Sequence, residues 1–211
     1  MIHVFLAGEG PNELGAFGKE ESFQPSSDKE RRKSPGVLEA LLRHVQEDGW
    51  EVTGGVRWKD IRKLQVGVGK KGEEASVHRA FLHAQKRGCH VLVFTRDRDK
   101  PKYKHRVDEI EAAIASLDGD GDGPAIIGGV AIEKLESWLV ALAGIAGSEG
   151  MTRPEDVLSK RGIAEKDTEA MLNLVNDADL TRIPADAVSL RAWLDRARAV
   201  LPARVKERAA E

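Results

Sequence analysis

The first 145 residues alternate between short apolar runs and longer segments whose apolar positions recur every three or four residues. Two compact runs, 2–7 and 90–94, are typical of strands buried on both faces. Two weaker strands are predicted over 51–58 and 125–127. Helical spacing predicts helices over 35–48, 73–87, 103–117 and 131–143. This alternation of strands and helices predicts an α/β fold with parallel pairing and right-handed crossovers.

The strand patterns end near residue 150. Helices are predicted over 152–160, with Thr152 as the N-cap, and over 165–175 and 188–208. We therefore expect an α/β domain over residues 1–148 and an α-helical C-terminal extension over residues 149–211. A segment rich in Ser, Lys, Glu, Arg and Pro, residues 19–35, predicts a loop.

Composition narrows the class of protein without naming one. The 33 Lys and Arg residues of the 211-residue chain nearly balance its 35 Asp and Glu residues, which disfavours a basic nucleic-acid coat or an acidic tail. A single cysteine, Cys89, excludes an internal disulfide framework. The longest weakly polar stretch, residues 124–132, is too short to span a bilayer. We expect a cytoplasmic protein with no membrane partner.

Acidic residues follow the two clearest strands. Glu9 and Glu13 come after the first strand, and Asp97 and Asp99 come after the strand at 90–94. The carboxyl ends of parallel strands meet in one crevice, so these carboxylates can share a divalent cation there. Hard oxygen ligands favour Mg²⁺ or Mn²⁺ over zinc. The pattern predicts a Mg²⁺-dependent site that cleaves phosphodiester bonds.

Basic residues occupy every second position after the same strand. The candidates for nucleic-acid binding are Arg96, Arg98, Lys100, Lys102 and Lys104, with Lys70 and Lys71 from an earlier segment. Such a row can hold phosphates by charge while the aspartates hold the metal. A salt-bridged, solvated loop is the alternative interpretation.

Other chemical patterns are incomplete. Gly8 and Gly10 begin a dinucleotide fingerprint, but Glu13 stands at the position of its third glycine. The loop from Asp118 to Gly123 imitates the start of an EF-hand, yet Gly129 occupies the position of the required glutamate. Neither pattern supports a nucleotide cofactor or a calcium site.

Three motifs in order resemble the Toprim domain. They are a strand followed by Gly8-Glu9-Gly10, a later strand followed by Asp97-x-Asp99, and a helix that opens at Ile132 and carries Glu136-Ser137-Trp138-Leu139. The chain is most similar to small stand-alone bacterial Toprim-like proteins and to the Toprim portion of the overcoming-lysogenization-defect nucleases. The resemblance covers residues 1–145 and implies a Toprim-like Rossmannoid parallel sheet flanked by helices, with the C-terminal helices as an extension.

The resemblance also implies residue roles. Glu9 would act as general acid/base or metal ligand, and Asp97 with Asp99 would coordinate Mg²⁺. Glu13 and Glu136 are candidates for a second metal, although Glu136 can also be read as a helix-surface residue. The small relatives often continue the last motif to an aspartate that this chain lacks, so one metal or two stays open. The implied activity is Mg²⁺-dependent cleavage of DNA or RNA, with a possible role in phage defence.

A second class of function stays open. The fold could serve as a non-catalytic or regulatory subunit that binds nucleic acid or a partner ATPase, since Toprim proteins of related systems work beside one. The apolar side of the helix at 188–208 would then be a docking surface, or it would pack on its own domain. A homodimer is a further possible arrangement.

Overall fold

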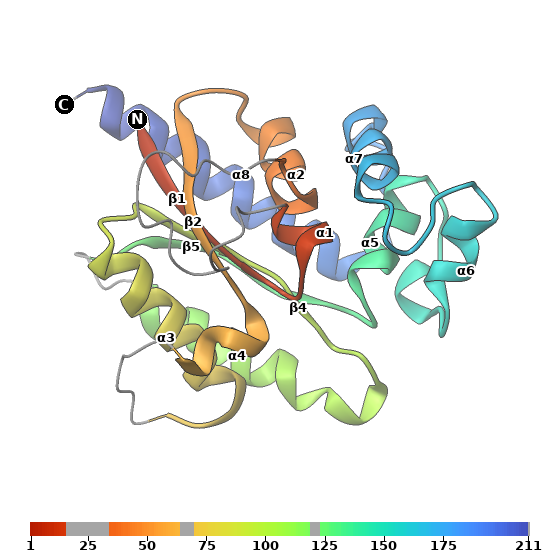
Figure 1. Ribbon diagram of the computed structural model, residues 1–211, viewed down its shortest axis with the longest axis horizontal. Helices are drawn as coiled ribbons and strands as arrows, with labels where there is room; N and C mark the ends of the chain where they lie inside the picture. Colours follow the sequence, from red (N-terminus) through yellow and green to blue (C-terminus); the bar gives the residue numbers. More distant parts are fainter. Residues whose placement is uncertain (16–33, 64–69, 119–122, 211) are drawn as a thin grey trace.

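The computed structural model describes residues 1–15, 34–63, 70–118 and 123–210 (Figure 1). Its strands are β1 (Ile2–Gly8), β2 (Trp50–Arg57), β3 (Val91–Phe94), β4 (Arg96–Asp97), β5 (Ala125–Ile127) and β6 (Val130–Ala131). Its α-helices are α1 (Pro11–Leu14), α2 (Val37–Val45), α3 (Gly72–Lys86), α4 (His105–Leu117), α5 (Leu135–Leu142), α6 (Pro154–Ser159), α7 (Thr168–Asp177) and α8 (Val188–Ala209). Short 3-10 turns cover Trp58–Lys63, Pro101–Tyr103 and Ser148–Gly150.

A four-stranded parallel sheet forms the centre of the molecule. Its strand order is β2-β1-β3-β5, and β1 pairs with both β2 and β3. Beyond the end of β3 the chain continues into β4, which pairs in parallel with β6 to form a separate two-stranded sheet. The predicted α/β class with parallel strands and flanking helices is confirmed, and the arrangement is Rossmann-like. All four main strands therefore end at the same edge of the sheet.

The sheet is buried on both faces, as its apolar runs predict. Successive residues of β1 alternate between two cores: Val4 and Leu6 belong to one, and Phe5 and Ala7 to the other. The first core contains α2 and α8, with α5 and α7 beside them, and the second contains α3 and α4 (Figure 1). The molecule is thus a helix–sheet–helix sandwich.

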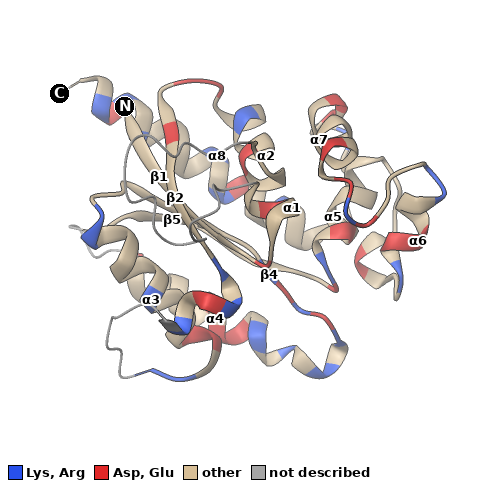
Figure 2. Ribbon diagram, viewed as in Figure 1, with Lys and Arg blue, Asp and Glu red and all other residues tan. Residues whose placement is uncertain are grey.

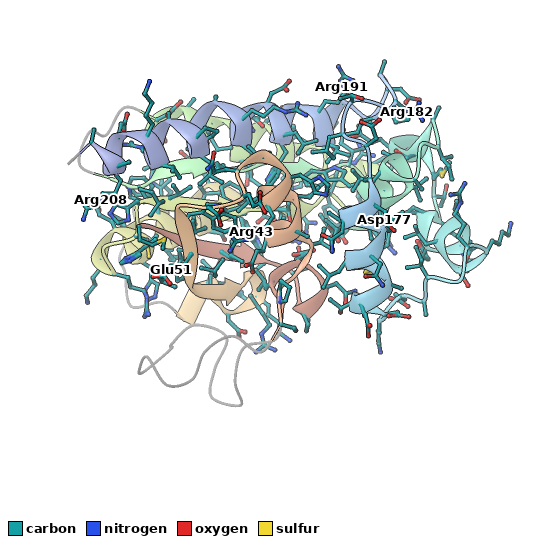
Figure 3. All side chains as sticks on the ribbon, turned by 90° about the horizontal axis from the view of Figure 1, so that it is seen from above. Arg43, Glu51, Asp177, Arg182, Arg191 and Arg208 are labelled. Carbon is teal, nitrogen blue, oxygen red and sulfur yellow. The ribbon has the colours of Figure 1, made fainter. Side chains whose placement is uncertain are left out.

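The C-terminal helix completes one of these layers. Five residues of α8 at intervals of one to four are buried in the first core: Leu190, Trp193, Leu194, Ala197 and Leu201. The indole Nε1 of Trp193 donates a hydrogen bond to the carbonyl of Phe94, at 3.0 Å. Figure 3 shows α8 running along the molecule, with Arg191 near one end and Arg208 near the other. The apolar side of the predicted C-terminal extension therefore packs on its own sheet.

The start of α8 is held by a carboxylate from another segment. Glu149 accepts hydrogen bonds from the backbone N–H groups of Ser189, at 2.8 Å, and Leu190, at 3.3 Å. A negative group at this position satisfies free N–H donors and interacts favourably with the helix dipole. Within the described residues, every helix is too short or too polar to cross a membrane.

Some predicted boundaries were wrong. The helix predicted over 131–143 begins only at Leu135, because Val130 and Ala131 pair with β4 and Glu133 takes a left-handed conformation with φ 65°. Likewise, α6 begins at Pro154 with Arg153 as its N-cap, so Thr152 does not cap it.

The third helix also differs in its start. Asp167 is the N-cap of α7, and its carboxylate accepts from the N–H of Ala170 at 3.0 Å, so the helix begins later than predicted. Most of the predicted loop at 19–35 and the tip of the loop at 118–123 lie outside the described residues.

We predict that Trp193→Ala lowers the free energy of unfolding by about 3–5 kcal/mol, the range for removing a fully buried aromatic side chain. The indole is 0% exposed, and its loss also leaves the carbonyl of Phe94 without this donor. Urea unfolding measures the change. Val188→Ala on the same helix is the control, since Val188 is 62% exposed and should change stability by about 0.5 kcal/mol or less. Equal stability of the two variants would contradict the integral packing of α8.

Candidate functional site

The turn after β1 places a carboxylate inside the protein. Gly8 and Gly10 let the chain leave the strand and enter α1, whose Glu13 folds back so that its carboxylate accepts a hydrogen bond from the N–H of Glu9. A Cβ atom on Gly8 would collide with Glu13 Oε2, so the glycine is needed for this arrangement. A Cβ on Gly36, at the start of α2, would likewise meet the backbone of Glu13. Glu13 is left only 4% exposed.

Two further carboxylates approach Glu13 from other elements. Asp97 ends β4, and its Oδ1 accepts a hydrogen bond from the N–H of Leu135, the first residue of α5, at 3.0 Å. Glu136 is the next residue of α5. We call Glu13, Asp97 and Glu136 the acidic trio. It joins segments of the chain that are more than 120 residues apart in sequence, as the parallel sheet requires.

Burial and mutual repulsion dominate the electrostatics of the trio. Burial raises the pKa of Glu13 well above its usual value, and the charges of Asp97 and Glu136 add to the increase. The pKa of Asp97 rises to about 7, through burial first and then through Glu136 and Asp99. Burial also raises the pKa of Glu136. The surroundings therefore favour a proton or a cation at this position.

The other two predicted carboxylates are held by arginines. Glu9 forms an ion pair with Arg96, and Asp99 forms one with Arg106. The strand ends at Asp97, and Asp99 lies beyond it in a left-handed conformation with φ 65°. Strand alternation therefore does not determine the direction of Asp99. Its charge nevertheless raises the pKa of Asp97, so the two carboxylates remain within electrostatic range.

A residue that the sequence analysis missed connects these arginines. Glu73, in the first turn of α3, accepts from Arg96 Nε at 3.2 Å and lies 3.0 Å from Arg106 Nε. It also accepts from the indole Nε1 of Trp58 at 2.7 Å. The sequence signal was general: an acidic residue in the first turn of a helix that follows a strand of the sheet. Many such residues only complement a helix dipole.

The predicted basic row divides into two groups. Arg96 and Arg98 are partly buried and paired with carboxylates, the latter with Glu133. The lysines Lys100, Lys102 and Lys104 are exposed, as are Lys70 and Lys71. Lys70 forms an ion pair with Glu74 on α3. Figure 2 shows acidic and basic residues alternating along the segment that leaves β4. Only the lysines are placed to meet a large ligand directly.

The donor chemistry of the trio suits a hard divalent cation. Its oxygens are anionic and poorly solvated, and their repulsion would be offset by a positive ion. The hydroxyl of Thr95, which lowers the pKa of Glu13, is fully buried and without a hydrogen bond of normal geometry in the described part of the chain. Among the described residues, no three His, Cys, Asp or Glu side chains are positioned to hold a metal together. Joint coordination by the trio therefore requires side-chain rotation.

Comparison with protein-family models, with curated proteins and with solved structures finds no match to this chain. The Rossmann-like arrangement is shared by proteins of many functions and does not by itself indicate an activity. The case for a function therefore depends on the residues at the carboxyl edge of the sheet.

We predict that the protein loses stability as pH rises from about 4 to 7, because the raised pKa of Asp97 means that its ionisation favours the unfolded chain. This contribution is complete below the unfolded pKa and is lost as pH passes the folded pKa of about 7. Asp97→Asn should reduce the decrease between pH 5 and pH 8 by about 1 kcal/mol or more. Chemical unfolding at both pH values measures it.

The groups that act on Asp97 in this experiment are Glu136, Asp99 and Arg96, together with the N–H of Leu135. Asp195→Asn, on the exposed side of α8, is the matched control and should leave the pH dependence unchanged. An identical pH dependence in wild type and Asp97→Asn would show that Asp97 is not held in the buried setting described above.

Proposed function

We propose that this protein is a divalent-metal-dependent phosphodiesterase of the Toprim type that cleaves DNA or RNA. The observation that carries the proposal is the acidic trio, a buried set of carboxylates gathered at the carboxyl edge of a parallel sheet. The order of the acidic motifs along the chain, which resembles that of Toprim domains, gives separate support. A role in phage defence belongs to the same proposal.

Burial of three carboxylates near one another is costly unless a ligand repays it. Each ionised group loses hydration, and each raises the pKa of a neighbour, so the trio opposes folding at neutral pH. Apolar residues of similar size would pack at such a position without this penalty. Strongly perturbed carboxyl groups at a strand edge are therefore typical of functional sites.

The proposal gives the carboxylates distinct roles. Glu13, Asp97 and Glu136 would hold Mg²⁺ or Mn²⁺ after rotation of their side chains. The bound ion would supply charge neutralisation at the phosphate, a more acidic water and stabilisation of the leaving oxygen. Glu9 lies beside the trio, with its side chain 33% exposed, and would transfer the proton at the attacking water or at the leaving oxygen. Asp99, also near Asp97, would be a further ligand.

The exposed lysines would guide the substrate. Lys100, Lys102 and Lys104 leave the site on the segment that follows Asp99, and Lys71 begins the helix that carries Glu73. Their charges would contact the phosphates of a strand lying over the carboxyl edge, without reading its sequence. The proposal therefore expects cleavage with little sequence preference.

We predict that Asp97→Asn and Glu13→Gln each reduce Mg²⁺-dependent cleavage by about 100-fold or more, since even outer partners of metal ligands contribute about 10–100-fold. Both changes keep the shape of the side chain and remove its charge. The assay incubates plasmid DNA, single-stranded DNA and structured RNA with Mg²⁺, Mn²⁺ or a chelator.

Asp195→Asn is the control for loss of one carboxylate and should keep wild-type activity. Thermal unfolding of each variant separates a lost site from a lost fold. Undiminished cleavage in Asp97→Asn would remove the proposal. Metal binding without cleavage of any of the three substrates would favour the non-catalytic alternative, in which the site serves a nucleic-acid-binding or ATPase-associated subunit.

We also predict that replacing Lys100 and Lys104 by Ala weakens nucleic-acid binding and lowers the salt dependence, log Kd against log salt, by about 1–2. Two lost phosphate contacts release fewer counterions. Fluorescence anisotropy with a labelled oligonucleotide at several salt concentrations gives the slope.

Replacement of Lys86 and Lys206 by Ala changes the net charge equally and is the control. Both side chains are exposed and lie at the other end of the sheet, where Lys86 ends α3 and Val205 of α8 contacts Gly49 beside the start of β1. Equal slopes for the two double variants would show that the Lys100 segment does not contact the phosphates.

A further inference from the structure

Two arginines lie together beside the acidic trio. Glu73 bridges the Nε atoms of Arg96 and Arg106, which belong to β4 and α4. Their side chains are only 12% and 13% exposed. Burial lowers the pKa of Arg96 to about 10, and the nearby charge of Arg106 contributes to the decrease. The two guanidinium groups therefore repel each other in a poorly solvated place, where an anion between them would be favourable.

Each arginine has one inner and one outer acidic partner. The inner partner of both is Glu73, which is 14% exposed. The outer partners are Glu9 for Arg96 and Asp99 for Arg106, with side chains 33% and 42% exposed. The outer partners are thus in contact with solvent and can be exchanged at lower cost than Glu73.

The inner contacts orient both guanidinium groups. Glu73 accepts at Nε of each, and Trp58 holds Glu73 through its indole N–H while its ring lies 5.7 Å from the Arg96 guanidinium carbon. Arg106 Nη1 also donates to the carbonyl of Asp97 at 2.9 Å. The arginines are therefore fixed relative to Asp97 through the backbone, and a planar fork fixed in this way matches the oxygens of a phosphate.

We propose that Arg96 and Arg106 form a phosphate-binding site in which the phosphate replaces Glu9 and Asp99, and that metal binding at the acidic trio strengthens it. The inference rests on the proposed function. A cation at the trio would attract Asp99, which already raises the pKa of Asp97, and Glu9, whose N–H binds Glu13. Movement of these carboxylates toward the cation leaves the arginines with fewer counterions. A phosphate then binds without having to displace them.

This arrangement couples the two ligands. Whatever phosphate binding gains from the metal, metal binding gains equally from phosphate, because the coupling is reciprocal. In the absence of metal, Glu9 and Asp99 compete with phosphate and keep the arginine site closed to anions. The substrate class recognised here is a phosphate group, either within a phosphodiester backbone or as a free or terminal phosphate.

The test is calorimetric titration of the full chain with Mg²⁺, alone, with inorganic phosphate, and with a dinucleoside monophosphate, at matched free Mg²⁺. We expect either anion to tighten Mg²⁺ binding by about fivefold or more. Arg96→Gln should bind Mg²⁺ but lose the coupling. Arg198→Gln, an exposed arginine of α8 paired with Asp195, is the matched control and should keep it.

A second variant covers the case in which Arg96→Gln does not fold. Glu9→Gln removes the outer partner of Arg96, so it should bind inorganic phosphate more tightly than wild type when no metal is present. Coupling with the dinucleoside monophosphate assigns the site to the substrate backbone, and coupling with inorganic phosphate alone assigns it to a terminal or free phosphate. Either result supports the inference.

Two results overturn it, and they differ. If Mg²⁺ binds with the same affinity with and without both anions, the arginine site is wrong and the proposed metal site stands. If Mg²⁺ does not bind at all, the proposed function is wrong and the coupling falls with it. Unchanged phosphate affinity in Glu9→Gln would also contradict the competition on which the inference depends.

Discussion

The burial of the Glu13 carboxylate over Gly8 is the constraint on which the site depends. The carboxylate occupies the space that a Cβ of residue 8 would need, and it is bound by the N–H of Glu9 at the start of the same turn. Because Glu13 is thus held at the carboxyl edge of β1, the ends of β4 and α5 bring Asp97 and Glu136 into its field. Three anions share a volume with little water, and their raised pKa values are the direct consequence.

The same edge of the sheet carries a compensating layer of positive charge. Arg96 and Arg106 are oriented by Glu73 and neutralised on their outer side by Glu9 and Asp99. The protein therefore keeps a repelling acidic set and a repelling basic set beside each other, each satisfied only in part. A divalent cation together with a phosphate would relieve both, which is why the proposed metal site and the proposed phosphate site belong to one functional unit.

The scaffold that holds this unit extends over the whole described chain. Val4 and Leu6 of β1 pack in the same core as Trp193 of α8, so the last helix contributes to the layer that supports the strand ends. The order of the acidic residues in the sequence was enough to predict a site at this edge, because parallel strands all end on one side. It was not enough to predict which carboxylates would meet, since that depends on where β4 ends and how Glu133 turns the chain toward α5.

The sequence by itself determined the α/β class, the parallel pairing and the positions of the main strands, because apolar runs of this length are stable only when both faces are covered. It also identified Glu13, Asp97 and Glu136 among its candidates. Only the tertiary structure decided that Glu9 and Asp99 are paired with arginines and that Glu73 connects those arginines. The physical reason is that hydrophobic periodicity is local, whereas ion pairs at a strand edge are selected by distances between segments remote in sequence.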